Sequence, residues 1–401
     1  MSFQFRQIQR VRAIAKATPI EVTEIITHHR PSIDDACAIA ILFFHGEKLF
    51  PAIDTAKISF WNRGDVDLLL DRYNGDSVQL LQETGKLIVG MAGSFLDEHP
   101  HEYNGQARAD NECAATLTAR LTGSYDDPCW RNVLRFVLQD DTGKRMDHLY
   151  LKAGQTLPNL MKAAYRVDYD NCDWSFDAAV QFIKTYHLAL ENGTMGLGDR
   201  PNWHIDHLVE LAGQKWAAEA GDKFYEVYSE SMKMSKAAEA SLDSLRPIEI
   251  RGWPNLRPIN ILFANNDIES FQTIVFRKQP KISVVVLRRS TGNVQIFTRK
   301  GSQIDLTNTT GLLRQMELQA RGEAIPQGVN LFQAGELKVC KRWCFFQPES
   351  GNDMLLNGSL TSPDTIATLL SNDHILQALT LGLKTAPTSQ QAKQYNKVVP
   401  V

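Results

Sequence analysis

The chain has 401 residues, of which 43% are hydrophobic and 22% are charged, and its formal net charge at pH 7 is −3. These values are typical of a globular protein with more than one core, and they exclude a protein that wraps duplex DNA through overall positive charge. The six cysteines are scattered, which is typical of a reducing compartment, and no apolar run reaches the roughly 18 residues of a membrane span. We therefore expect a soluble, cytoplasmic protein without membrane contact.

Strands and helices alternate in the first part of the chain. An amphipathic helix ends near Pro19, a strand ends at Ile26, and a helix begins near Ala36. Short apolar runs predict further strands at 49–53, 56–61 and 86–91, and periodic stretches predict helices at 65–73, 111–121 and 130–138. This alternation predicts a parallel sheet covered by helices.

The pattern of predicted elements is different in the second part of the chain. Helical patterns dominate to about residue 245, including the stretch 206–241, and three prolines between 247 and 258 mark a boundary. Beyond it we predict strands at 259–263, 283–288, 294–298 and 343–346, and helices at 308–321 and 365–383. The predicted fold class is α/β with four parts: a parallel-sheet domain (1–190), a helical connector (191–246), a smaller mixed α/β substrate-binding domain (247–385) and a flexible tail (386–401).

Three polar turns follow apolar segments. They span residues 28–35 (HHRPSIDD), 97–100 (DEHP) and 140–143 (DDTG). A polar turn at the end of a strand is where parallel α/β folds bind ligands. Imidazole together with carboxylate is the ligand mix of Mn²⁺ and related ions, whereas thiolates would indicate structural zinc. The three turns therefore predict a divalent-metal site.

The order and spacing of these turns resemble the DHH phosphoesterase superfamily. Residues 28–35 follow the layout of its first motif, His-x-x-Pro-Asp-x-Asp-Ala, and residues 97–100 resemble its Asp-His-His-Pro motif. Residues 141–143 match the Asp-Thr-Gly form of its fourth motif, and the stretch 88–99 (IVGMAGSFLDEH) is similar to the MYG-type branch.

This resemblance implies a metal-dependent phosphodiesterase of the exonuclease type, which uses Mn²⁺ (or Mg²⁺), one or two ions, to activate water. It implies catalytic roles for Asp34, His99 and Asp141. The implied metal ligands are His28, Asp34, Asp35, Asp97, His99 and Asp141, with Asp140 in reserve. The candidate phosphate-binding residues are Arg30, Arg145, Asn357, Gly358 and Ser359.

The sequence departs from the family pattern at three places. Ser32 stands where the first motif has its leading Asp, and Glu98 stands where the naming motif has its first His. The second motif, an Asp at a strand end, falls near Gly90 or Met91, where no carboxylate is present. These departures leave open one ion, a site rebuilt with Asp35 and Asp97, or no catalysis.

Each turn also has a structural interpretation. Ser32 or Asp34 could cap the following helix, His99 could be a buried structural histidine, and residues 141–143 could be an ordinary helix exit.

The leading hypothesis is hydrolysis of short single-stranded oligonucleotides or small nucleotides, with a homodimer as a possible assembly. The alternative is a catalytically silent DHH-like module that binds a nucleotide or a protein. A pyrophosphatase or a phosphatase for another phosphate ester is a third, weaker hypothesis.

Overall fold

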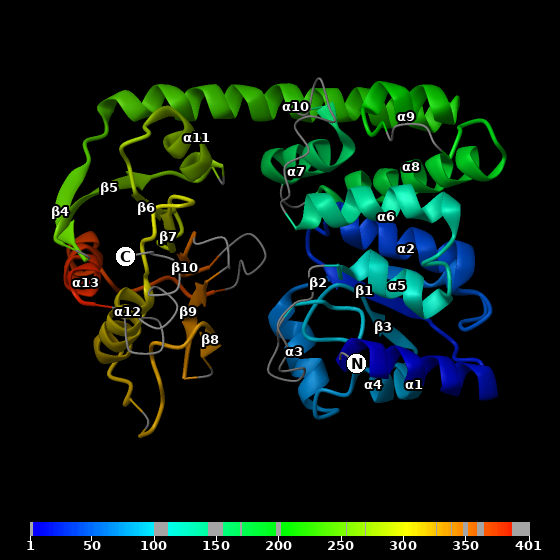
Figure 1. Ribbon diagram of the computed structural model, residues 1–401, viewed down its shortest axis with the longest axis horizontal. Coiled ribbons are helices and arrows are strands. Elements are labelled where there is room, and N and C mark those ends of the chain that lie inside the picture. Colours follow the sequence, from blue (N-terminus) through cyan, green and yellow to red (C-terminus); the bar gives the residue numbers. More distant parts are fainter. Residues whose placement is uncertain are drawn as a thin grey trace, which may run out of the picture. The chain divides into compact units, whose positions relative to one another are not determined.

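The computed structural model describes residues 3–99, 111–142, 155–168, 171–197, 202–253, 255–268, 270–325, 327–337, 339–347, 352–358 and 365–386. The chain divides into two compact units, Met1–Ser231 and Met232–Val401, whose elements are labelled in Figure 1. Among the described helices none is both long and apolar enough to cross a membrane. All six cysteines lie in described segments, and none of them is in a disulfide.

A parallel sheet forms the centre of the first unit. Its described strands are β1 (Glu24–His28), β2 (Lys57–Trp61) and β3 (Lys86–Ile88), in the order β2-β1-β3. β1 pairs in parallel with both neighbours, so that His28 lies opposite Trp61 and Ile26 lies opposite Ile88. The predicted parallel α/β architecture is therefore confirmed.

Alternate side chains of these strands enter two cores on opposite faces of the sheet. Ile25 belongs to a large core that includes α2 (Ile33–His45) and α5 (Ala114–Thr122). Ile26 belongs to a smaller core with α3 (Arg63–Asp71) and α4 (Ser77–Thr84). Figure 1 shows these two pairs of helices on the two sides of the sheet. Because both faces are covered, the strands can be apolar on both sides.

Further helices complete the first unit and connect it to the second. They are α1 (Phe3–Ala17), α6 (Pro128–Asp141), α7 (Leu157–Val167), α8 (Asp173–Glu191), α9 (Ile205–Ala212) and α10 (Lys215–Ser241). The boundary between the units lies within α10, and so within the segment predicted as a connector. Gly213, with a φ of 58°, ends α9, so the helical stretch predicted at 206–241 is interrupted there.

The strand predicted at 49–53 is wrong. The backbone N–H groups of Leu49 and Phe50 both donate to the carbonyl of Gly46, and a short 3-10 helix (Ile53–Thr55) follows. Ala52 adopts a positive φ of 58°. The apolar run is therefore a turn held by its own backbone hydrogen bonds, and it pairs with none of the described strands.

The second unit contains a mixed sheet. Among described residues its order is β4 (Ile248–Gly252), β5 (Arg257–Asn265), β6 (Val284–Arg288), β7 (Val294–Thr298), β10 (Met354–Leu356), β9 (Cys340–Phe346) and β8 (Gly335–Leu337). β5 and β6 are parallel, with α11 (Phe271–Lys278) between them, and the other neighbours are antiparallel. This confirms the predicted mixed α/β class.

Helices cover both faces of this sheet as well. Val284 and Val286 enter a core with α12 (Thr307–Ala320) and α13 (Asn372–Lys384). Val285 and Leu287 enter a second core with α11. α13 begins later than the predicted residue 365, because Ser371 caps it by accepting the backbone N–H of His374.

Asp353 is a buried acid that ties two segments of the second unit together. Its carboxylate accepts the backbone N–H of Leu306 at 2.8 Å, and its carbonyl accepts the N–H of Thr298 at 2.9 Å. Burial, with a further contribution from Asp305, raises the pKa of Asp353 to about 7. The folded unit therefore holds a proton here over a pH range in which the unfolded chain has lost it.

This difference predicts that stability falls as pH rises. Between about pH 4 and pH 7 the native state binds more protons at Asp353 than the unfolded state does, so the free energy of unfolding decreases with pH. Asp353→Asn should remove this contribution, which is at most about 4 kcal/mol. Denaturant unfolding of both proteins between pH 4 and pH 8 measures it, with Asp373→Asn, an exposed site, as control. Parallel curves for wild type and Asp353→Asn would contradict this account.

Candidate functional site

The described residues of the three predicted turns lie close together at the carboxyl edge of the first unit's sheet. β1 ends at His28, α2 begins five residues later, and the loop after β3 carries Asp97 to His99. The N-terminus of α5 lies at the same edge, where its backbone is hydrogen-bonded to Asp34. Asp141, the last residue of α6, is also there, and its carboxylate lies within 4.8 Å of that of Asp34. This edge is where parallel α/β sheets bind ligands.

Ser32 caps α2 and fixes Asp35. The Ser32 hydroxyl accepts the N–H groups of Asp34 and Asp35, and the Asp35 carboxylate accepts the Ser32 N–H at 2.7 Å. The predicted capping role of Ser32 is therefore confirmed. Because the cap is reciprocal, the Asp35 side chain is held at the start of the helix.

Asp34 caps a different helix. Its two carboxylate oxygens accept the backbone N–H groups of Ala114 and Ala115, both at 2.9 Å, at the first turn of α5. The positive end of a helix favours an ionised carboxylate. Each oxygen has two lone pairs, so one hydrogen bond per oxygen still permits metal binding. This contact joins α2 to α5 and places Asp34 at the centre of the site.

Gly90 accommodates the Asp35 carboxylate. Gly90 has a φ of +71°, and a Cβ at this position would lie 2.0 Å from Oδ1 of Asp35. The family's second-motif Asp would fall at or next to this residue. Asp35 therefore fills the space beside the position where the sequence lacks a carboxylate.

His28 is oriented by the same glycine. Its Nε2 donates to the carbonyl of Gly90 at 2.5 Å, so in a neutral ring Nδ1 carries the lone pair. Burial lowers the pKa of His28, although the negative charge of Asp97 opposes this effect. A neutral imidazole is the form that binds a metal ion.

The turn at 97–99 forms one compact group of ligand atoms. Oδ2 of Asp97 accepts the Gly93 N–H at 2.7 Å, and Oδ1 accepts both the backbone N–H and Nδ1–H of His99 at 2.9 Å. The Glu98 carboxylate lies 3.2 Å from the same Nδ1. Potential ligand atoms of Asp97, Glu98 and His99 all lie within 4.8 Å of one another.

A second group adjoins it. Potential ligand atoms of Asp34, Cys113 and Asp141 also lie within 4.8 Å of one another. Burial raises the pKa of Asp35 and of Glu98, and the charge of Asp34 adds to the rise in both, so the two groups share one electrostatic environment. The structure therefore brings together all six predicted ligands, and their roles as ligands stay predictions.

The carboxylates fit a divalent cation. Asp34, Asp35, Asp97 and Glu98 are all at least 96% buried. Burial, reinforced by neighbouring carboxylates, raises the pKa of Asp35 and of Glu98 above their usual ranges. For Asp97, hydrogen bonds from His99 and Gly93 outweigh burial and lower the pKa. Concentrated buried carboxylates repel one another, and a bound cation would relieve that repulsion.

The predicted phosphate-binding residues that the structure describes are divided between the two units. Arg30 is buried and has a positive φ of 69°. Asn357 is fully buried in the second unit, where its amide donates to two carbonyls and accepts the N–H of Thr368. The Gly358 carbonyl accepts from the Gln295 side chain. Arg145 and Ser359 lie outside the described residues, so the phosphate contacts at these five positions stay predictions.

Sequence reasoning missed Cys113 and gave Glu98 only a secondary place. Both are buried and close to predicted ligands. Cys113 lies within the predicted helix 111–121, whereas in the structure it is the N-cap of α5, beside the groups that contact this helix end. The position of Cys113 near the start of a predicted helix was the signal that could have identified it. The sequence does not show, however, that Asp34 contacts this end of α5.

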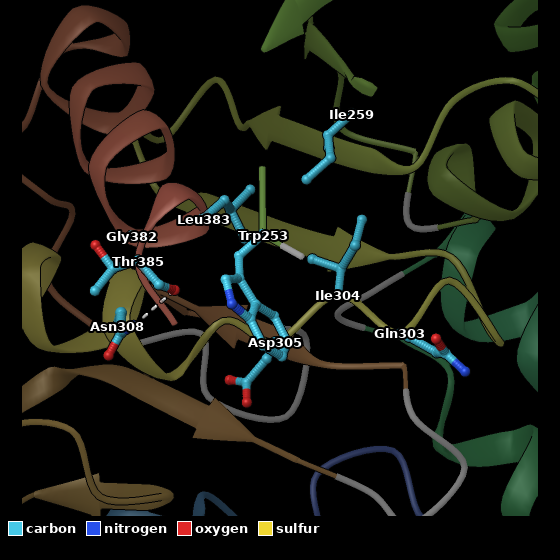
Figure 2. A pocket seen from close by; sticks show the side chains of 9 residues that line it. All are labelled: Trp253, Ile259, Gln303, Ile304, Asp305, Asn308, Gly382, Leu383 and Thr385. Atoms are coloured by element: carbon cyan, nitrogen blue, oxygen red, sulfur yellow. Dashed lines mark hydrogen bonds between the residues drawn. The ribbon is translucent and has the colours of Figure 1, made fainter. Parts of the chain in front are cut away.

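A small cavity lies within the second unit and is lined by Trp253, Asp305 and Asn308, among others (Figure 2). Its volume is about 20 Å³, and the Asn308 amide donates to the Thr385 carbonyl at its edge. This space suits one water molecule and excludes a nucleotide.

Comparisons with known proteins show no matching family model and no matching curated protein. Among solved structures, the chain is similar to the DHH domain of a member of the s1p family of ribosomal proteins, with 12% identity, 96% of this chain and 93% of that chain covered, and a TM-score of 0.44. It is also similar to an uncharacterised protein from Helicobacter pylori G27, with 9% identity, 90% and 99% covered, and a TM-score of 0.26. Similarity at these scores says nothing about activity.

The contact between Gly90 and Asp35 predicts an unequal response of two glycines in this unit. Gly90→Ala should displace the Asp35 carboxylate, whereas Gly193, with a similar φ of +76°, has nothing within 4 Å of a Cβ. Gly193→Ala should cost only the backbone strain of about 1–2 kcal/mol. Gly90→Ala should cost about 1–3 kcal/mol more, because a buried hydrogen-bonded carboxylate must move. Denaturant unfolding tests this, and equal losses would contradict it.

Proposed function

We propose that this protein is a divalent-metal-dependent phosphodiesterase that hydrolyses short oligonucleotides or small nucleotides. The observation that carries the proposal is the convergence of His28, Asp34, Asp35, Asp97, His99 and Asp141 at one edge of the sheet. Histidine and carboxylate ligands in this combination suit Mn²⁺ or Mg²⁺. The motif resemblance supports phosphodiester hydrolysis as the reaction.

Each residue has a distinct task in this proposal. His28, Asp34, His99 and Asp141 would hold one or two ions, with Asp35 and Glu98 supplying further carboxylates. The bound metal would activate water and offset the negative charge on the phosphate. Asp97 acts as a positioning residue, because its carboxylate fixes the His99 ring through Nδ1.

The electrostatics of the site make substrate binding depend on the cation. A phosphodiester carries a negative charge, and buried carboxylates surround the place it must reach. Without a cation these charges repel the phosphate, and with one they hold the metal that attracts it. Removal of metal should therefore stop turnover and remove the contribution of the phosphate to binding, while contacts to the rest of the substrate remain.

A second candidate is a catalytically silent relative that binds a nucleotide or a protein. The specific observation in its favour is Gly90, which leaves no carboxylate where the second motif places one. The two candidates differ in whether Asp35 can replace the missing ligand. Metal binding and turnover on the full chain separate them.

Metal binding is tested by calorimetry with Mn²⁺ on the metal-stripped full chain. Wild type should bind at micromolar affinity or better, and His99→Ala should weaken binding at least about tenfold, because one ligand is lost. His374→Ala, an exposed histidine of α13, is the matched control and should bind as wild type does. No binding by wild type would overturn the proposal.

Catalysis is tested with Asp141→Ala beside Asp140→Ala. Asp141 lies near Asp34 and Cys113, whereas the neighbouring Asp140 pairs with Lys162 at 3.2 Å. Asp141→Ala should reduce turnover of a dinucleotide in Mn²⁺ by at least about a hundredfold and keep the fold, and Asp140→Ala should remain within a few-fold of wild type. Circular dichroism checks the fold. Equal activity of the two variants would contradict the assigned role.

A further inference from the structure

A cavity of about 540 Å³ lies beside the candidate metal centre in the first unit. It is lined by the end of β1, the end of β2 and one side of α3, chiefly by His29, Trp61, Asn62, Leu68, Leu69 and Arg72. This volume is in the range of pockets that hold small molecules. None of the metal-site roles assigned above uses these side chains.

The cavity and the metal centre share the end of β1. His28 pairs with Trp61 in the parallel register, and the N–H of His29 donates to the Trp61 carbonyl at 3.1 Å. His28 is bonded to the loop after β3, whereas His29 lines the cavity on the β2 side. A molecule that spans these adjacent residues can contact both places.

The lining is suited to a flat aromatic ring with a polar edge. Trp61 supplies an indole that is half-buried and lies under the Lys86 ammonium, 4.9 Å from the ring centre. Leu68 is an apolar side chain that is 62% exposed. The polar groups are the His29 ring, the Asn62 amide, which can both donate and accept, the Asp65 carboxylate and the Arg72 guanidinium.

We propose that this cavity is a nucleobase subsite of the hydrolase. The base would pack against Trp61 and Leu68, and Asn62 would contact its hydrogen-bonding edge. Aromatic side chains bind bases by stacking, which tolerates any base, and an amide adds contacts to the base edge. This inference rests on the proposed function and specifies its substrate as a nucleotide recognised through its base.

Binding of nucleoside monophosphates to the full chain in EDTA tests the subsite. Saturation-transfer NMR would compare the four ribonucleoside 5′-monophosphates with ribose 5-phosphate, which lacks only the base. At least one nucleotide should bind at least about tenfold more tightly than ribose 5-phosphate, because stacking contributes only when a base is present. Equal binding of all five compounds, or no binding of any, would overturn the proposal.

Matched variants locate the subsite on the structure. Trp61→Ala and Leu68→Ala should each weaken nucleotide binding, the first at least about tenfold, and Trp61→Phe should retain most of the affinity. Leu188→Ala is the control, because Leu188 on α8 is 45% exposed and does not line the cavity. Leu68 is exposed, so its loss should leave the fold intact even if Trp61→Ala unfolds. Affinity equal to that of Leu188→Ala in a folded Leu68→Ala, or in a folded Trp61→Ala, would contradict the assignment.

Failure of the base subsite and failure of the proposed hydrolase function give different experimental results. Nucleotide binding in EDTA without Mn²⁺ binding would support the subsite and overturn the hydrolase. Mn²⁺ binding that depends on His99, without base-dependent nucleotide binding, would overturn the subsite alone.

Discussion

The two carboxylates in the first turn of α2 determine how the site is built. Burying a carboxylate without hydrogen bonds is costly, so each must find backbone donors. Asp34 takes them from the first turn of α5, and Asp35 takes one from Ser32. The contacts of Asp34 connect α2 to α5. Segments that are far apart in the chain are therefore joined through polar atoms as well as through the core.

Gly90 satisfies two requirements at once. Its Cα lies against the Asp35 carboxylate, and its carbonyl accepts a hydrogen bond from His28. A side chain at this position would displace the Asp35 carboxylate. An aspartate here and the observed position of Asp35 are therefore mutually exclusive. The Asp35 carboxylate thus occupies the space beside the position at which the motif resemblance places a carboxylate.

Sequence patterns predicted those parts of the structure that depend on local rules. The parallel sheet follows from alternating strands and helices, and the Ser32 cap follows from hydrogen bonds that span three residues. The contact of Asp34 with Ala114 spans 80 residues and leaves no local signal. Cys113 was missed for the same reason, because Asp34 and Asp141, its neighbours at the site, are distant from it in the sequence. The run at 49–53 failed because apolar composition does not reveal that Gly46 accepts its N–H groups.

The end of β1 carries both the candidate metal centre and the proposed base subsite. Adjacent strands of a sheet are about 4.8 Å apart, so residues at the ends of β1, β2 and β3 lie within the span of one nucleotide. His28 and His29 are consecutive, yet one is bonded toward β3 and the other lines the cavity beside β2. A base held on the β2 side would therefore place its own phosphate, rather than a distant one, near the buried carboxylates. For the hydrolase proposed above, this arrangement would favour action at a terminal nucleotide or on a small nucleotide over cleavage within a long strand.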